Sequence, residues 1–342
     1  MAKPIIFWVG ATGYLGSEAL LLLNDYLPKP NSYHVVALVR NATPERVSEL
    51  KRLYPDIETL QGTLDDEKII REAAAQADVV INTGDSLHPG CVHGILAGLT
   101  TRAKSNTGAP DPIYVHVSSS TILTDGCNGE HVEPTVWTDK DFDVHTKLEA
   151  DAVHADTEFP IADAGKRSEH RIRTFVMNPA LIYGVGSGVQ RNSSWLRFWV
   201  DTTKETGYSG LYGEGANALG HVHVRDAATA LLTVLNAALE GKIQGGKDAN
   251  YFVSVSKTGQ KNWSEVIGNH MHSKGVIKEA GCRPWPEAVT GTRGSLWWLT
   301  FGGNQILSSD RLYALGWEPT ETKKQSLIDN LPEAVDALLQ SK

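Results

Sequence analysis

The 342-residue sequence lacks the features of several protein classes. It has only three cysteines, widely spaced (Cys91, Cys127 and Cys282), so we expect no disulfide framework. No apolar run approaches the roughly 18 residues that a membrane span needs, and the first residues enter a strand pattern without the parts of a signal peptide. No basic run stands out, and acidic residues outnumber basic residues 40 to 32. We therefore expect a cytoplasmic protein without nucleic-acid or membrane partners.

Tryptophan, by contrast, is abundant. Hydrophobic residues make up 41% and charged residues 21%, which is typical of a globular protein of about two domains. Six of the nine tryptophans lie in the C-terminal half, before Trp317 (Trp195, Trp199, Trp263, Trp285, Trp297 and Trp298). Their concentration predicts either an apolar wall for a bulky substrate or the packed core of a second lobe.

Short β-branched runs alternate with helical patterns over the first half of the chain. The predicted strands are 4–10, 34–40, 57–62, 78–83, 111–118 and 171–178, and the predicted helices are 15–26, 44–54, 65–77, 91–104 and 141–156. This alternation predicts a doubly wound parallel α/β sheet, the Rossmann arrangement. We expect residues 1–180 to form this domain, with 221–256 returning to it. The segments 181–220 and 257–342 would form a smaller C-terminal substrate-binding lobe.

A glycine pattern follows the first predicted strand and opens the first helix. It consists of Gly10, Gly13 and Gly16, interrupted by Thr12 and the pair Tyr14-Leu15. Glycines at such a turn let the backbone approach a pyrophosphate, which then sits on the N-terminus of the following helix. The strand-turn-helix context predicts a dinucleotide site rather than a tight turn alone.

Further motifs occur in a consistent order along the chain. They are three serines at the end of the fifth strand, a proline-containing segment after the sixth, a valine- and aspartate-containing stretch, and a Leu-Gly-Trp segment near the C-terminus (118–120, 178–184, 221–226 and 308–319). With the G-x-x-G-x-x-G spacing, they make the chain resemble the atypical and extended short-chain dehydrogenase/reductases. These include the NmrA-like and the epimerase/dehydratase-like families.

The resemblance implies a set of cofactor contacts. Arg40 ends the second strand where an acid would bind the ribose of NAD, and an arginine there pairs with the 2′-phosphate of NADP. We therefore expect NADP(H) as the cofactor. The cofactor-binding positions implied by the glycine motif and by the resemblance are Gly10, Thr12, Gly13, Tyr14, Leu15, Gly16, Arg40, Asn41, Leu64, Asn82, Thr83, Gly84, Lys147, Asn178, Pro179 and Leu181.

The expected catalytic motif departs from the family pattern. The family uses Tyr-x-x-x-Lys on a helix, where the lysine assists proton transfer by the tyrosine, and Lys147 matches the position of that catalytic lysine. Asp143 lies four residues before it, however, and residues 139–150 contain no tyrosine. One interpretation is that Asp143, with Ser120, stabilises a cationic substrate that accepts a hydride without a proton on oxygen. A second is that His145 serves as the acid-base group. Asp85, just past the fourth strand, is another candidate for stabilising a cation.

Two functions of different class remain open. The first is an NADP(H)-dependent reductase that transfers hydride to a C=N, C=C or C=O group of a bulky apolar molecule, such as a secondary-metabolite intermediate, with cyclisation as a coupled step. Its substrate residues would include Asp85, Trp195, Trp199 and Tyr212. The second is an NmrA-like regulator that senses NADP without turnover, and an epimerase or dehydratase ranks third. We expect a monomer or homodimer and no metal site, since no ligand set has metal-binding spacing.

Overall fold

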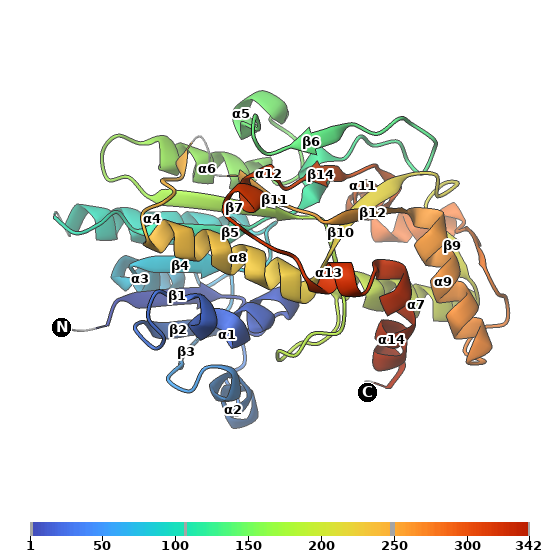
Figure 1. Cartoon of the computed structure of the whole chain (residues 1–342), viewed down its shortest axis with the longest axis horizontal. Helices are drawn as coiled ribbons and strands as arrows, with labels where there is room; N and C mark the ends of the chain where they lie inside the picture. The colour runs from blue at the N-terminus through green and yellow to red at the C-terminus, as the bar shows by residue number, and fades with distance from the viewer. Residues whose placement is uncertain (1–2, 106–107, 247–249, 341–342) are drawn as a thin grey trace.

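A seven-stranded parallel sheet forms the centre of the molecule. Figure 1 shows the structure, a computed structural model that describes residues 3–105, 108–246 and 250–340. The sheet has the order β11-β7-β5-β4-β1-β2-β3, and all six neighbouring pairs run parallel. Its strands are β1 (Ile5–Val9), β2 (His34–Val39), β3 (Glu58–Gln61), β4 (Val79–Asn82), β5 (Ile113–Val117), β7 (Arg173–Pro179) and β11 (Asn250–Val253).

Helices cover both faces of this sheet. One face packs against α1 (Tyr14–Tyr26), α2 (Pro44–Leu53) and α8 (Val224–Leu239) in a single hydrophobic core. The other face packs against α3 (Glu67–Gln76), α4 (Pro89–Ser105) and α6 (Ala155–Lys166) in a second core. Strands buried on both sides must be apolar throughout, and four of the five residues of β1 are buried. The predicted doubly wound α/β fold is confirmed.

Local signals in the sequence fix several of these elements. Pro44 is the first residue of α2, and the hydroxyl of Thr43 accepts a hydrogen bond from the Arg46 amide at 3.4 Å. This is the cap expected from a threonine directly before a helical proline. Leu50 and Leu53 form the buried side of the helix. The cap and the apolar side together orient α2 beside β2.

The C-terminal half adds smaller sheets and a second group of helices. The small sheets join β8 (Leu181–Tyr183), β10 (Ala218–His223) and β12 (Ser256–Gly259), β9 (Ser209–Leu211) with β13 (Cys282–Pro284), and β6 (Val136–Thr138) with β14 (Ile306–Ser308). The main helices are α7 (Ser194–Thr206), α9 (Gln260–Ser273), α11 (Ser295–Gly302) and α14 (Leu327–Gln340). They enclose an aromatic cluster of Trp195, Trp199, Tyr212, Trp263, Trp285 and Phe301.

The strand order places a crevice at the carboxyl ends of the central strands of the large sheet. From β1 the chain proceeds outward to β2 and β3, then crosses back to β4 and continues through β5 and β7. At such a reversal the connections leave in opposite directions, which opens a crevice at the carboxyl ends of β1 and β4. Ligands of open α/β sheets bind at this position.

The single helix predicted over 141–156 is wrong. The structure has a four-residue α5 (Val144–Lys147), and α6 starts only at Ala155. Leu148 is extended and ends α5, whereas His154 has the left-handed φ of 70° and sits directly before α6. The ring of His154 is buried, with Nδ1 3.4 Å from the carbonyl oxygen of Ser86. The extended Leu148 ends the first helix, and the left-handed His154 prevents the second from starting before Ala155.

Three properties of the described residues bear on the class of protein. None of their helices has the length and apolar character needed to cross a membrane. The three cysteines are free. Within the described ranges no group of three or more His, Cys, Asp or Glu side chains is arranged to hold a metal ion.

Candidate functional site

The glycine loop between β1 and α1 forms the floor of the crevice. Gly10 has φ +83°, and a Cβ on it would lie 2.5 Å from the amide nitrogen of Gly84. A Cβ on Gly16 would lie 2.2 Å from the carbonyl oxygen of Gly10. Helix α1 begins after Gly13, which provides no side-chain cap. Its first amides are thus available to an anionic group, as a bound pyrophosphate requires.

A cavity of about 490 Å³ lies beside this loop, at the ends of β2 and β3. We call it the outer cavity; it is lined by Val9, Gly10, Thr12, Leu38, Arg40, Gly62, Thr63, Leu64, Asp65, Gly84, Asp85 and His88. The Asp66 carboxylate fixes one wall, because its Oδ2 accepts hydrogen bonds from the Thr63 amide at 2.7 Å and hydroxyl at 2.9 Å. Arg40 is exposed at the rim. The lining thus combines apolar side chains with Arg40 and with the carboxylates of Asp65 and Asp85.

A second cavity, of about 360 Å³, continues the crevice toward β5 and β7. This inner cavity is lined by Tyr14, Leu15, Thr83, Gly84, Val117, Ser118, Ser119, Ser120, Thr121, Pro179, Ala180, Leu181, Ile182, Gln190, Ser193, Ser194, Trp195, Leu219, Thr300 and Gln305. Gly84 lines both cavities, so they meet at the end of β4. The pair thus follows the carboxyl ends of the strands, where a dinucleotide binds in this type of fold.

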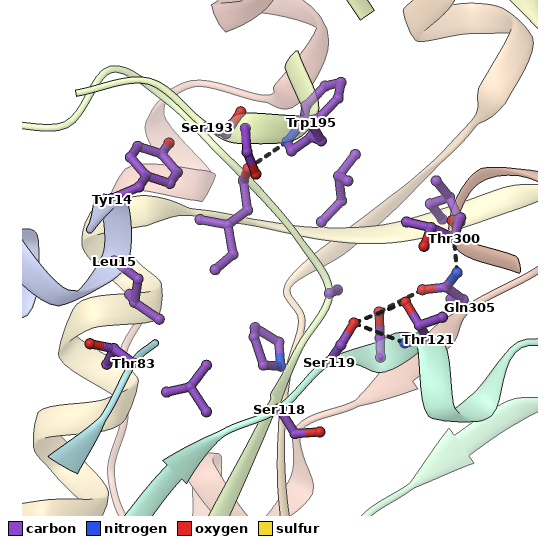
Figure 2. Close-up of a pocket in the computed structure, with 18 of the residues that line it drawn as sticks. Tyr14, Leu15, Thr83, Ser118, Ser119, Thr121, Ser193, Trp195, Thr300 and Gln305 are labelled. Carbon is purple, nitrogen blue, oxygen red and sulfur yellow. Dashed lines mark hydrogen bonds between the residues drawn. The ribbon is translucent and has the colours of Figure 1, made fainter. Parts of the chain in front are cut away.

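Hydrogen bonds fix the hydroxyl of Ser120 in the inner cavity. Figure 2 shows Ser119, Thr121, Thr300 and Gln305 on one side of the cavity and Tyr14, Leu15 and Thr83 on the other. Ser120 Oγ donates to Gln305 Oε1 at 2.6 Å, and Gln305 Nε2 donates to the Thr300 carbonyl oxygen at 2.8 Å. Because the Ser120 proton is committed to Gln305, its oxygen has only acceptor capacity left for a ligand.

The inner cavity holds very little acid-base capacity. Among the described residues that line it, Tyr14 is the only one with an ionisable side chain. The Tyr14 hydroxyl donates to the Gly184 carbonyl oxygen at 2.5 Å, and burial raises the pKa of this phenol well above its usual value. A phenol with a raised pKa is a poor proton donor near neutral pH. The cavity therefore offers apolar surface and hydroxyl oxygens rather than charge.

The three residues predicted for proton transfer or charge stabilisation lie outside both cavities. Asp143 caps α5 by accepting from the His145 amide at 3.0 Å, and it pairs with Lys166 at 3.3 Å. The His145 ring pairs with Asp163 at 3.0 Å. Lys147 is exposed, and neither cavity includes it. Of the predicted catalytic residues, the structure brings only Ser120 to the crevice.

The remaining predicted positions divide into two groups. Those that line a cavity are Gly10, Thr12, Tyr14, Leu15, Arg40, Leu64, Thr83, Gly84, Asp85, Pro179, Leu181 and Trp195. Asp85 lines the outer cavity rather than the inner one. Those that line neither are Gly13, Gly16, Asn41, Asn82, Asn178, Trp199 and Tyr212; Trp199 and Tyr212 are fully buried in the aromatic cluster. Trp199 and Tyr212 therefore pack in the core of the C-terminal half and do not line either cavity.

A buried polar network lies behind the inner cavity and was not predicted. The Glu158 carboxylate accepts from Asn178 Nδ2 at 3.0 Å and from Asn250 Nδ2 at 3.3 Å. Burial raises the pKa of Glu158, although these hydrogen bonds oppose the rise. Glu158 follows His154 by one helical turn at the start of α6. Its partners lie 20 and 92 residues further along the chain, so no local pattern in the sequence indicates this network.

Gln305 was also missed, for a different reason. It lies 185 residues from its partner Ser120 and just before β14. No local pattern in the sequence joins two residues at that separation. Only the packing of β10 between β8 and β12, with the Gln305 amide bonded to the Ala218 carbonyl at 3.1 Å, brings it to the crevice.

Comparisons with known proteins agree with this geometry. Residues 2–89 match the model of the NmrA-like family. The chain is 28% identical to the oxidase ucsJ of Acremonium sp over 334 residues, which cover 92% of each protein. Its structure superposes on DesIV, a dTDP-glucose 4,6-dehydratase from Streptomyces venezuelae solved with NAD, with TM-score 0.65, 16% identity and coverage of 98% and 97%. Vestitone reductase from alfalfa superposes with TM-score 0.60, 17% identity and coverage of 98% and 99%.

These findings identify the fold and a partial sequence similarity. The fold is that of the NAD(P)-dependent epimerases and dehydratases, the extended short-chain dehydrogenase/reductases. More particularly, the N-terminal quarter, which carries the glycine loop and β1 to β4, is NmrA-like in sequence. The predicted resemblance is confirmed on both counts.

Proposed function

We propose that the protein is an NADP(H)-dependent oxidoreductase that exchanges a hydride with a bulky, largely apolar small molecule. The observation that carries the proposal is the pair of joined cavities along the strand ends. The outer cavity has an arginine at its rim, and the inner cavity has an apolar and hydroxyl-lined wall. The inner volume of about 360 Å³ falls within the range of small-molecule sites.

The residues of the crevice fit the cofactor. Bound NADP(H) supplies hydride chemistry at C4 of its nicotinamide ring. The uncapped N-terminus of α1 would hold the pyrophosphate, and Leu64 would border the adenine. Arg40, which pairs with no carboxylate of the described residues, would bind the 2′-phosphate. The glycine loop supports this fit, because a Cβ at Gly10 or Gly16 would clash with neighbouring backbone.

The scarcity of acid-base groups narrows the substrate class. A carbonyl that accepts a hydride becomes an alkoxide and needs a proton from the enzyme. An iminium carbon that accepts a hydride becomes a neutral amine, and no proton is required. Tyr14 is the only ionisable residue in the described part of this lining, and its pKa is raised, so the cavity favours the iminium substrate. The Ser120 oxygen would accept a hydrogen bond from an N–H of the same group.

The same geometry accommodates hydride transfer in either direction, from NADPH to the substrate or from the substrate to NADP⁺. The Acremonium relative is named an oxidase, which supports testing oxidation of an amine to an iminium ion by NADP⁺ as well. Leu181, Ile182, Trp195 and Leu219 would form the apolar wall for the substrate. Coupling to cyclisation, a role in secondary metabolism, a cytoplasmic location and a monomeric or homodimeric state remain predictions.

The test is a spectrophotometric assay of NADPH oxidation with a panel of cyclic iminium ions, enones and ketones. We expect turnover with the iminium ions. Ser120→Ala should lower kcat/KM for an N–H iminium by about tenfold, the size of one hydrogen bond to a charged group. Ser48→Ala, an exposed serine on α2, is the matched control and should not change kcat/KM. A preference for ketones would refute the substrate assignment.

A regulator without turnover is the second candidate, favoured by the NmrA-like match of residues 2–89. It requires that NADPH binds while no compound of the panel is consumed. A dehydratase or epimerase is the third, favoured only by the fold shared with DesIV. Titration with dTDP-glucose and UDP-glucose tests it, and tight binding of either sugar nucleotide would replace the first proposal.

A further inference from the structure

Four arginines surround a third cavity next to the crevice. This arginine cavity, of about 870 Å³, is lined by Thr12, Arg40, Arg46, Glu49, Val185, Val189, Gln190, Arg191, Asn192, Arg197, Ala337 and Gln340. Two of the arginines belong to the end of β2 and to α2, and two belong to the loop before α7 and to α7 itself. The cavity is therefore built from both halves of the chain.

The charge of this cavity is not balanced. None of its four arginines forms an ion pair with a carboxylate of the described residues, and Glu49 is the single acidic residue of the lining. The chain as a whole carries a formal net charge of −8. Four like charges around one cavity repel one another, and a bound anion relieves this repulsion. Guanidinium groups bind phosphate through paired, charge-assisted hydrogen bonds.

The position of the cavity indicates which anion it receives. Thr12 and Arg40 line both this cavity and the outer cavity, and Gln190 lines both this cavity and the inner one. The arginine cavity thus borders the crevice along the phosphate-bearing part of a dinucleotide. Because Arg40 lines both the arginine cavity and the outer cavity, where the adenosine would lie, the 2′-phosphate is the group that would reach it.

The loop that carries Arg191 is held in place by α1. The buried Glu18 carboxylate accepts from the Ser187 amide at 2.7 Å and from the Gly188 amide at 3.2 Å, and Ser17 Oγ accepts from the Val189 amide at 2.9 Å. This loop joins β8 to α7, and Figure 1 shows the yellow-green chain before α7 near α1. Arg191 Nε donates to the Gly186 carbonyl oxygen at 3.0 Å. The arginine is therefore positioned before any ligand binds.

We propose that Arg191 and Arg197 complete a phosphate site with Arg40 and Arg46, so that the C-terminal lobe contributes to the selection of NADP(H) over NAD(H). The inference rests on the proposed function and adds to it two residues from the C-terminal half of the chain. The chemistry recognised is a phosphate monoester dianion next to a ribose. Binding of this group would join the two halves of the chain through charge-assisted hydrogen bonds.

The test is a fluorescence titration of the full chain with NADPH, NADH, 2′,5′-ADP and 5′-ADP. Arg197→Gln and Arg191→Gln should each raise the Kd of NADPH and of 2′,5′-ADP about tenfold. Both should change the Kd of NADH and 5′-ADP less than twofold. Lys204→Gln, on the same helix as Arg197 but outside the cavity, is the matched control and should change none of the four. Added salt should weaken 2′,5′-ADP binding less in the two arginine variants than in the wild type.

The other possible results of these titrations decide between the inference and the proposed function. An unchanged Kd of NADPH in both variants overturns the inference while leaving the proposed function intact. Equal weakening of NADPH and NADH also overturns it, because the arginines would then contact the pyrophosphate that both cofactors share. If Arg191→Gln fails to fold, Arg197→Gln decides alone, since this exposed side chain has no ion pair to lose. A wild type that binds neither NADPH nor 2′,5′-ADP refutes the proposed function itself.

Discussion

Substitution of Gly16 by alanine should damage the cofactor site through backbone contact. The added Cβ would lie 2.2 Å from the Gly10 carbonyl oxygen and 2.5 Å from Thr83 Oγ1. Gly10 has no free space to retreat, because its own position lies against the backbone of Thr83 and Gly84. Relief requires a shift of the glycine loop or of α1, at a cost of about 1–3 kcal/mol for overpacking. If that cost falls on the bound form, the Kd of NADPH rises about 5- to 150-fold.

The assay is the titration of Gly16→Ala with NADPH, alongside a thermal unfolding curve. Gly90→Ala is the matched control, because its Cβ would meet nothing closer than His88 Cε1 at 3.4 Å, in ordinary contact. We expect the control to bind as the wild type does. Unchanged NADPH binding by Gly16→Ala would show that the loop does not form the floor of the cofactor site.

Three further predictions follow from side chains outside the cofactor floor. Asp143→Asn should leave turnover within about twofold, since asparagine also caps α5 and the Lys166 pair is partly exposed; a tenfold loss would restore the cation-stabilising role predicted from the sequence. Glu18→Ala should lower the free energy of unfolding, measured in urea, by about 3 kcal/mol or more, because it removes the acceptor of two loop amides and the carboxylate that pairs with Arg225. A decrease of less than about 1 kcal/mol would contradict the proposal that Glu18 anchors the loop. Burial lowers the pKa of His221 from 6.5 to about 4, so the folded state keeps the ring neutral and loses stability as pH falls from 6.5 toward 4. The free energy of unfolding should be about 2 kcal/mol lower at pH 5 than at neutral pH, and His221→Gln should reduce this difference. Equal pH dependence of the variant and the wild type would refute the assignment of the stability loss to His221.

The fold was predictable because its signals are local. The apolar runs of β1 to β5, the cap at Thr43 and the glycine loop each act within a few residues, and the structure has them where the sequence indicates. Strand β11, expected to return to the large sheet, does pair with β7. Patterns of this kind report which face of an element is buried.

The chemical end of the site was less predictable. The predicted helix is divided into α5 and α6, and Asp143, His145 and Lys147 lie outside both cavities. The Gln305–Ser120 hydrogen bond joins residues 185 apart, and no periodicity encodes such a contact. Tertiary packing decides both features, and it overrides the local propensity from which the prediction was made.

Tertiary packing also decides where the tryptophan side chains lie. Composition left an aromatic substrate wall and a packed lobe core as alternatives, and Trp199, Trp263 and Trp285 fill the core of the C-terminal half. Trp195 is the one tryptophan that lines the inner cavity among the described residues, and its Nε1 donates to the Ile182 carbonyl oxygen at 2.7 Å. A count of aromatic residues does not separate packing from a pocket lining.

Parallel titrations of the wild-type protein with NADPH and NADH test the central claim most directly. The account predicts that NADPH binds at least about tenfold more tightly, since Arg40 and its neighbours find a phosphate to pair with only in NADPH. Equal binding of the two cofactors would contradict the role given to the arginines. Binding of neither would contradict the assignment of the crevice as a dinucleotide site.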